Sequence, residues 1–331
     1  MIENLIAIVA GIAILVWSAD RFVMGAAATA QHMNISPLII GLVIMGFGTS
    51  APEMMVSSLA AMEGSPSIGI GNAIGSNIAN IALVLGATAM ILPITVRSEI
   101  LRREFPILIA VTIGCGLILL DYSLDRMDGA ILLFSLILLM AWLIQTSKES
   151  SSSDTLGTEV GEEIPQLPIK RALFWTVAGL IALLLSSRLI VWAAVEIAQA
   201  FGISELIIGL TIIAIGTSLP ELAASITAAL KREHDMAIGN IIGSNMFNIL
   251  GVLALPGLIA PSIIEPSVLS RDFMVMAALT LMLFIMVRLF GSNGQVADIQ
   301  QSTLKTIGRI EGTILLACFF SYLGLLYYQT L

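Results

Sequence analysis

Two glutamates in this sequence stand in nearly identical surroundings, and hydroxyl side chains precede both of them. Glu53 ends the segment GTSAPE at residues 48–53, and Glu221 ends the segment GTSLPE at residues 216–221. Each segment lies near the middle of an apolar stretch, where a charge costs about 2.5–3.5 kcal/mol in a bilayer. No basic residue is close to either glutamate in the sequence. Two such carboxylates suggest a site at which a cation binds and leaves.

A second pair of segments adds neutral oxygen ligands. The segments are GNAIGSNIAN at residues 71–80 and GNIIGSNMFN at residues 239–248. Hydroxyl, amide, carbonyl and carboxylate oxygens are hard ligands that suit Ca²⁺. No His or Cys accompanies them, which disfavours zinc or copper. A four-residue spacing places a serine and an asparagine of each segment on one helix face; these pairs are Ser76 with Asn80, and Ser244 with Asn248.

The glycine and proline residues of the first pair of segments predict interrupted helices. Proline lacks a backbone donor and clashes with the preceding turn, while glycine loosens the helix just before it. We expect each helix to divide there, which leaves the carbonyls around residues 46–47 and 214–215 without an intrahelical partner. In lipid, such carbonyls must accept a bond from another group or line a polar cavity. The C-terminal end of a half-helix is also partly negative, which favours a cation.

The composition indicates what positions these groups. The 331 residues are 57% hydrophobic and 11% charged, whereas a soluble domain carries roughly 25% charged residues. A polytopic membrane protein follows, and the net charge of −8 gives no sign of a nucleic-acid partner. Ten stretches approach the roughly 20 apolar residues that a membrane helix needs. They are residues 4–25, 37–62, 68–92, 104–121, 127–145, 171–192, 204–230, 236–260, 272–290 and 308–328.

An internal repeat divides the chain into halves. Residues 35–85 align with residues 203–253 without a gap, at a constant offset of 168, and about half of the positions are identical. Each half holds five predicted spans, an odd number, so the second half enters the membrane from the opposite side. We expect an all-α polytopic membrane protein with ten transmembrane helices in two inverted-topology five-helix repeats and broken helices at the core. The repeats are predicted at residues 1–147 and 170–331, with a polar linker at 148–169.

The Lys and Arg residues predict the orientation. Eleven of them fall on one side of the predicted spans, and only Arg126 and Arg271 fall in loops on the other side. The richer side is expected to be cytoplasmic. This prediction puts the linker in the cytoplasm and both termini outside.

The two pairs of segments together resemble the paired repeat motifs of the Ca²⁺/cation antiporter superfamily and are similar to those of the prokaryotic Na⁺/Ca²⁺ exchangers. The resemblance covers the whole plan of ten helices, two inverted halves and a central polar loop. It implies four cation sites in a diamond between the broken helices. The long first and sixth helices resemble the pair of helices that slides in this family.

Carried over position by position, the resemblance implies a role for each polar residue of the motifs. Some relatives, including the K⁺-dependent branch, carry Asp where this chain has Asn248, which argues against K⁺ dependence. The implied ligands are Glu53 and Glu221 as carboxylates shared by Ca²⁺ and Na⁺; Thr49 and Thr217 through backbone oxygens to Ca²⁺; Ser50, Ser218, Ser76, Ser244 and the carbonyls of Gly46 and Ala214 to Na⁺; and Asn80 and Asn248 at the middle position.

These residues predict a secondary active transporter that exchanges Ca²⁺ for Na⁺ by alternating access. Extrusion of Ca²⁺ is electrogenic if three Na⁺ replace one Ca²⁺. An H⁺/Ca²⁺ or other cation antiporter is the alternative, and a passive cation channel is a more remote one. An enzyme is not expected, because the sequence contains neither HExxH nor GxSxG. The expected partners are the transported ions Ca²⁺ and Na⁺, or H⁺, and the lipid of a prokaryotic plasma membrane, with no cofactor, nucleic acid or obligate protein partner.

Overall fold

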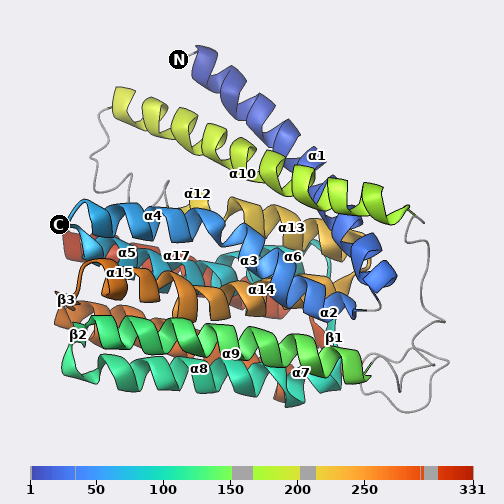
Figure 1. The fold of residues 1–331 in the computed structure, drawn as a ribbon. Coiled ribbons are helices and arrows are strands. Elements are labelled where there is room, and N and C mark those ends of the chain that lie inside the picture. The colour runs from blue at the N-terminus through green and yellow to red at the C-terminus, as the bar shows by residue number, and fades with distance from the viewer. Residues whose placement is uncertain are drawn as a thin grey trace.

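The computed structural model describes residues 2–33, 35–150, 167–201, 214–290, 292–293 and 305–330. Most of the described chain is helical (Figure 1). The helices of the first half are α1 (Ile2–Met33), α2 (Pro37–Ile39), η1 (Ile40–Met45), α3 (Gly46–Thr49), α4 (Ala51–Met62), α5 (Pro66–Ala79), η2 (Asn80–Leu85), α6 (Gly86–Ile91), α7 (Ser98–Arg102), α8 (Glu104–Ile118), η3 (Leu119–Asp121) and α9 (Arg126–Ser150). Those of the second half are α10 (Ile169–Ala200), α12 (Ala214–Thr217), α13 (Leu219–Leu230), α14 (His234–Phe247), η5 (Asn248–Val252), α15 (Ala254–Ile259), η6 (Val268–Phe273), α16 (Met274–Ile285), η7 (Met286–Phe290) and α17 (Arg309–Thr330).

Within the described residues, nine helical segments are long and apolar enough to cross a membrane, and they match nine of the predicted spans. The remaining prediction, residues 204–230, begins outside the described ranges, and α12 and α13 form its later part. Helices α1 and α10 are longer than predicted, with 32 residues each. Their alanine-rich ends lie beyond the most apolar stretches, and alanine is the strongest helix former.

The predicted linker at residues 148–169 falls mainly on residues 151–166, which lie outside the described residues. Helix α9 continues to Ser150, and α10 begins at Ile169. The exact limits of the two halves therefore remain predictions.

Backbone details of the two halves recur at the offset of 168 residues. A π-helical stretch begins at Asn80 in the first half and at Asn248 in the second. The turn after α4 has a φ of 80° at Gly64, and the turn after α13 has a φ of 62° at Arg232. A positive φ is rare for a residue with a side chain. Its presence at Arg232 means that the turn geometry is repeated even where the glycine is not.

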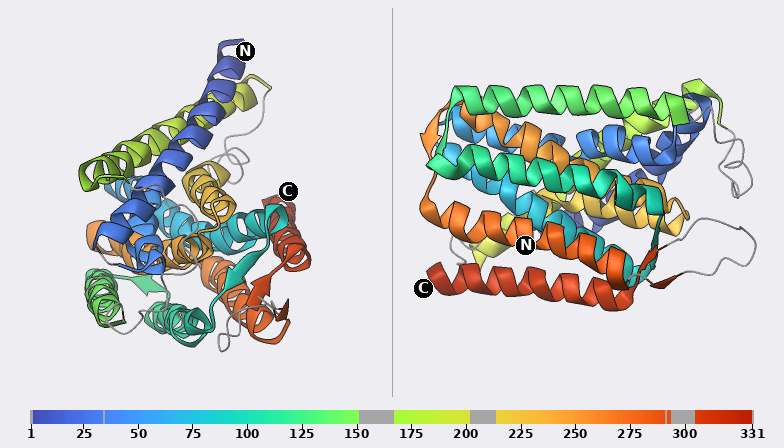
Figure 2. Two further views of the ribbon diagram at one scale, coloured as in Figure 1. Left: turned by 90° about the vertical axis from the view of Figure 1, so that its right-hand side faces the viewer. Right: turned by 90° about the horizontal axis from the view of Figure 1, so that it is seen from below.

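Helices α1 and α10 lie side by side and cross one face of the bundle that the other helices form (Figures 1 and 2). Glycines bring the two backbones close together. A Cβ on Gly25 would lie 2.5 Å from the amide nitrogen of Thr176, and a Cβ on Gly179 would lie 2.7 Å from that of Phe22. Because backbone atoms cannot move aside as a flexible side chain can, this crossing requires glycine at both positions.

Short strands join the two halves at opposite ends of the bundle (Figure 1). At one end, β1 (Ile94–Val96) pairs antiparallel with β5 (Lys305–Ile307), which also pairs with β4 (Ser292–Asn293). At the other end, β2 (Ser123–Leu124) pairs antiparallel with β3 (Ser262–Ile263). We refer to these as the β1 end and the β2 end.

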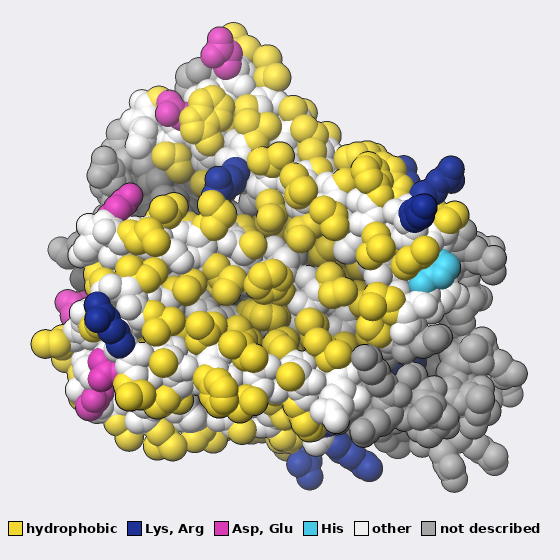
Figure 3. All heavy atoms as spheres, viewed as in Figure 1, with side chains coloured by type: hydrophobic (Ala, Val, Ile, Leu, Met, Phe, Trp, Pro, Cys, Tyr) yellow, Lys and Arg dark blue, Asp and Glu magenta, His cyan; other side chains and the backbone are white. Residues whose placement is uncertain are grey.

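The surface of the bundle is apolar between these ends. Figure 3 shows hydrophobic side chains over most of one face, with acidic side chains gathered toward one end. Large apolar side chains are exposed on many of the long helices, for example Ile6, Leu117, Phe134 and Phe320. A water-soluble monomer rarely exposes so wide an apolar surface. Helices that satisfy their own backbone groups and present such a surface form an integral membrane protein.

Candidate cation site

Each GTS-x-PE segment interrupts a helix at its second hydroxyl residue, as the sequence predicts. Helix α3 ends at Thr49, Ser50 has φ −79° and ψ 2°, and α4 begins with Pro52 in its first turn. In the second half, Ser218 has φ −87° and ψ 2° between α12 and α13. Proline suits the first turn of a helix because its missing donor has no intrahelical partner there.

This interruption puts Glu53 and Glu221 in the first turns of α4 and α13. The N-terminal end of a helix is partly positive and favours a carboxylate. Both side chains are buried, at 1% and 0% exposure. Glu53 lies within electrostatic range of Glu221 and close to Thr217. Two buried acids that face each other repel unless a positive charge lies between them.

Eight buried side chains at equivalent positions of the two halves carry oxygen or nitrogen atoms that form no hydrogen bond within the described part of the chain. Burying such an atom without a partner costs about 1–3 kcal/mol. Oxygens without a protein partner are free to coordinate a cation, and their symmetric placement in the two halves is typical of a cation-binding site. The pairs are Ser50 and Ser218, Glu53 and Glu221, Asn77 and Asn245, and Asn80 and Asn248.

Helix α14 crosses η1 and α3 of the other half and brings Thr49 to its polar face. The hydroxyl oxygen of Thr49 lies 3.2 Å from that of Ser244 and 3.3 Å from Oδ1 of Asn240. The same hydroxyl donates to the Met45 carbonyl at 3.0 Å. Residues nearly 200 positions apart thus form one polar cluster.

The prediction that the carbonyls around residues 46–47 and 214–215 lack an intrahelical partner is wrong for two of them. The Gly46 carbonyl accepts a hydrogen bond from the Ser50 amide at 3.1 Å, and the Ile215 carbonyl accepts one from the Ser218 amide at 3.2 Å. Proline removes only its own amide, so the serine amide two positions earlier still bonds backward. The Ser244 hydroxyl also donates a hydrogen bond to the Gly46 carbonyl oxygen at 3.5 Å. A carbonyl oxygen has two lone pairs, so a cation at Gly46 would take the place of the hydrogen bond from the Ser244 hydroxyl.

The GN-x-x-GSN helices are altered by a π-helical stretch rather than by a gap. Helix α5 runs without a break into η2 at Asn80, and α14 runs into η5 at Asn248. A π-helical turn shifts the backbone hydrogen bonds by one residue and is frequent at functional sites. Ser76 and Ser244 lie one turn before these junctions and are buried.

Two asparagines that the motifs contain, but to which the sequence assigns no role, position the glutamates. Asn240 donates from Nδ2 to the Glu221 carbonyl at 3.4 Å and to the Ser225 hydroxyl at 2.9 Å. Asn72 donates to the Glu53 carbonyl and to the Ser57 hydroxyl, both at 3.1 Å. With its amide hydrogens used in this way, Asn240 directs Oδ1 toward Thr49. In the sequence, each asparagine follows its glutamate by 19 residues in both halves, and this repeated spacing is the signal that could have identified the pairs.

Asn240→Ala is expected to raise the KM for Ca²⁺ about tenfold, because the Ser225 hydroxyl and Thr49 each lose a buried partner, at about 1–3 kcal/mol. Initial rates of ⁴⁵Ca²⁺ uptake over a range of Ca²⁺ concentrations measure this change. Thr280→Ala is the matched control, since that buried hydroxyl donates to the Met276 carbonyl of its own helix and has no other bond within the described ranges. An unchanged KM for Asn240→Ala would contradict the positioning role.

The described residues contain no group of three or more His, Cys, Asp or Glu side chains that could hold a metal ion. The cluster around Glu53 and Glu221 instead combines two carboxylates with hydroxyl and amide oxygens. Such a set binds Ca²⁺ or Na⁺ but has no nitrogen or sulfur ligand for a transition metal. Ala214, another predicted ligand, is the first residue of α12.

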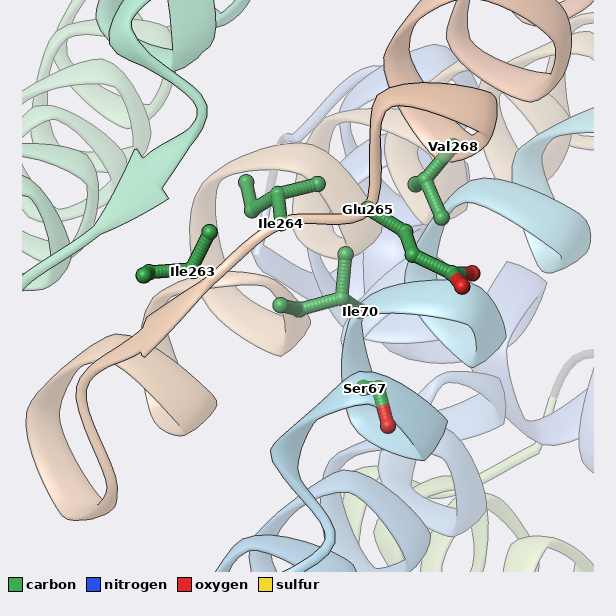
Figure 4. Close-up of a pocket in the computed structure, with 6 residues that line it drawn as sticks. All are labelled: Ser67, Ile70, Ile263, Ile264, Glu265 and Val268. Atoms are coloured by element: carbon green, nitrogen blue, oxygen red, sulfur yellow. The ribbon is translucent and has the colours of Figure 1, made fainter.

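A separate cavity of about 360 Å³ lies at the β2 end of the bundle, between the start of α5 and the segment from β3 to η6 (Figure 4). Figure 4 shows Ser67 and Glu265 as its polar side chains, and the rest of its lining is aliphatic. None of the predicted cation ligands lines it. The cavity is therefore distinct from the glutamate cluster.

A family model described as "Sodium/calcium exchanger protein" matches residues 3–145 and 171–328, and the interval falls on the predicted linker. The putative antiporter CaxA of Alkalimonas amylolytica is 49% identical over 328 residues, which are 99% of each chain. Inner membrane protein YrbG of Escherichia coli is 43% identical over 274 residues, covering 81% of this chain and 84% of its own.

Among solved structures, the sodium-calcium exchanger NCX_Mj soaked with 2.5 mM Na⁺ and 0.1 mM Ca²⁺ has a TM-score of 0.81 and 30% sequence identity, and the match covers 98% of both chains. This likeness extends over both halves and supports the predicted arrangement of two inverted five-helix repeats. The family model also spans most of the chain. The chain therefore belongs to the sodium/calcium exchanger family of the Ca²⁺/cation antiporter superfamily.

Proposed function

We propose that this protein exchanges Ca²⁺ for Na⁺ across the membrane by alternating access and extrudes Ca²⁺ from the cell. The observation that carries the proposal is the symmetric set of buried, unpartnered oxygens around Glu53 and Glu221. The twelve residues predicted as ligands are Glu53, Glu221, Thr49, Thr217, Ser50, Ser218, Ser76, Ser244, Asn80, Asn248, Gly46 and Ala214. We propose that Asn77 and Asn245 join them.

The charges of the site favour an electrogenic exchange. One Ca²⁺ balances the two glutamates, whereas three Na⁺ leave one surplus positive charge. Moving that charge across the membrane potential makes transport sensitive to voltage, by about 2.3 kcal/mol per 100 mV. Two Na⁺ or two H⁺ in exchange for one Ca²⁺ would be electrically neutral.

Flux into proteoliposomes tests this function. Vesicles are loaded with Na⁺, with K⁺ or at acidic pH, and ⁴⁵Ca²⁺ uptake is followed with and without a valinomycin clamp. We expect uptake only with internal Na⁺, and faster uptake when the interior is held positive, because three Na⁺ leave for each Ca²⁺ that enters and one net positive charge moves outward. Uptake driven by the proton gradient alone would make the protein an H⁺/Ca²⁺ antiporter. Uptake without any counter-ion gradient would indicate a channel.

We further propose that the protein resides in the plasma membrane of a prokaryote, with the β1 end in the cytoplasm and both termini outside. The distribution of Lys and Arg supports this orientation, and the E. coli relative is named an inner membrane protein. A cysteine at Ser152 is expected to resist a membrane-impermeant maleimide in intact cells and to react after lysis. Cys115 and Cys318 are first replaced by alanine, since they are the chain's two cysteines. Labelling in intact cells would reverse the orientation.

A further inference from the structure

An ion pair ties α1 to the rest of the bundle at the β1 end. Oδ1 of Asp20, in the middle of α1, lies 2.6 Å from Nζ of Lys231. Lys231 caps the C-terminus of α13, where the partly negative helix end favours a cation. Asp20 thus links the long crossing helix to the helix that carries Glu221.

The repeat assigns an equivalent to each of these residues 168 positions away: Arg188 on α10 for Asp20, and Glu63 for Lys231. The packing of α1 on α10 confirms the register. A Cβ on Gly11 would lie 2.6 Å from Cγ1 of Ile190, and the equivalent Gly179 meets Phe22, the equivalent of Ile190. The amide of Glu63 bonds to Leu59 O, as that of Lys231 bonds to Thr227 O.

The two equivalent pairs have opposite charges: acid on α1 with base on α13, and base on α10 with acid on α4. The second pair is apart in this conformation. Nη2 of Arg188 lies 3.5 Å from Sδ of Met55, and no ion pair of Arg188 or Glu63 occurs in the described part of the chain. Glu63 caps the C-terminus of α4, where its negative charge is disfavoured without a cation beside it.

We propose that the two pairs are alternate latches of the transport cycle: Asp20–Lys231 forms in one access state and Arg188–Glu63 in the opposite one. The proposal rests on the proposed exchange by alternating access. In an inverted repeat, the opposite-facing state arises when the two halves exchange their conformations. In that state, α10 forms with α4 the ion pair that α1 forms with α13 in the present structure. The first latch must open for the second to close.

The contact between the α1–α10 pair and the core is suited to such a movement. Its buried side chains are mostly alanines, including Ala19, Ala26, Ala224 and Ala228. Small side chains leave shallow ridges that do not lock two helices in one register. Partly exposed ion pairs contribute little stability, so each latch can open once per cycle.

Cross-linking tests the latches without depending on flux. In the chain lacking Cys115 and Cys318, cysteines are placed at positions 20 and 231, at 63 and 188, or at all four. A short bis-methanethiosulfonate reagent suits the reach of the native side chains better than a direct disulfide. We expect both pairs to link, and the four-cysteine protein to link one pair per molecule. Cysteines at positions 20 and 63 are the mismatched control. Failure of the 63–188 pair to link while the 20–231 pair links would overturn the proposal.

Charge exchange tests the same latch in transport. Glu63→Arg faces Arg188 with a like charge and is expected to slow exchange about tenfold, and adding Arg188→Glu is expected to restore it to within about threefold. Equilibrium ⁴⁵Ca²⁺ binding in detergent should stay constant in the single and the double variant, because the latch does not touch the ion. Wild-type turnover of Glu63→Arg would defeat the latch and leave the exchange function standing. If both cysteine pairs cross-linked but the protein showed no Na⁺-driven flux, the latch would stand and the proposed exchange function would fail.

Discussion

Glu221→Gln and Glu53→Gln are each expected to reduce Na⁺-driven Ca²⁺ uptake by on the order of 100-fold. Each substitution removes one of the two negative charges that balance Ca²⁺ in the buried cluster. The remaining surplus charge costs about 3 kcal/mol in the membrane interior, which corresponds to this loss of affinity. Uptake of ⁴⁵Ca²⁺ into Na⁺-loaded proteoliposomes measures the effect.

The glutamine variants keep the shape of the side chain, so correct folding can be checked by gel filtration and by thermal unfolding. Glu3→Gln is the matched control, because Glu3 lies exposed near the start of α1. Its uptake should equal that of the wild type. If either core variant retained more than a small fraction of wild-type uptake, that glutamate could not be the shared ligand of Ca²⁺.

Gly243→Ala is expected to lower both the thermal stability and the transport rate. A Cβ at this position would collide with the Leu42 carbonyl oxygen and would lie 2.7 Å from Leu42 Cα. Both are backbone atoms of η1, so α14 must move away from the first half. Overpacking of this kind costs about 1–3 kcal/mol, which we expect to lower Tm by about 5 °C. The shift also separates Ser244 from Thr49.

Gly324→Ala on α17 is the control, because no described atom lies within 4 Å of the added methyl group. Thermal unfolding followed by intrinsic fluorescence compares the two variants at equal detergent concentration. A Gly243→Ala protein with the Tm and uptake of the wild type would mean that the helices are not held at this distance in the membrane.

The repeat made the positions of the acidic and hydroxyl residues predictable, because identical residues at a fixed offset cannot result from apolar composition alone. The interruption at Ser50 followed from Pro52, whose effect on a helix is local. The bonding of Asn240 to Thr49 was not predictable, because it depends on how α14 crosses α3. The Gly46 carbonyl was misjudged for a related reason. Its partner amide lies within the same turn, and no rule on proline excludes that bond.

The ends of α1 and α10 show a second limit of the sequence. Hydropathy locates the part of a helix that lies in lipid, but alanine-rich turns continue the helix beyond it. The additional turns of α1 carry Thr29, whose hydroxyl lies 3.3 Å from that of Thr176 on α10. Similarly, Asp20 and Lys231 are 211 positions apart, and only the three-dimensional arrangement brings them within 2.6 Å.

The deep burial of α14 has a consequence for how the protein is made. In the segment from His234 to Ile259, 89% of the most apolar window is buried inside the protein, against 17% for the segment of α17. Helix α14 therefore has almost no surface for lipid, and its Asn240, Ser244 and Asn245 need protein partners as soon as they enter the membrane. The ribosome delivers the N-terminal half first. By the time α14 leaves the translocon, η1 and α3 are already in the bilayer to receive it.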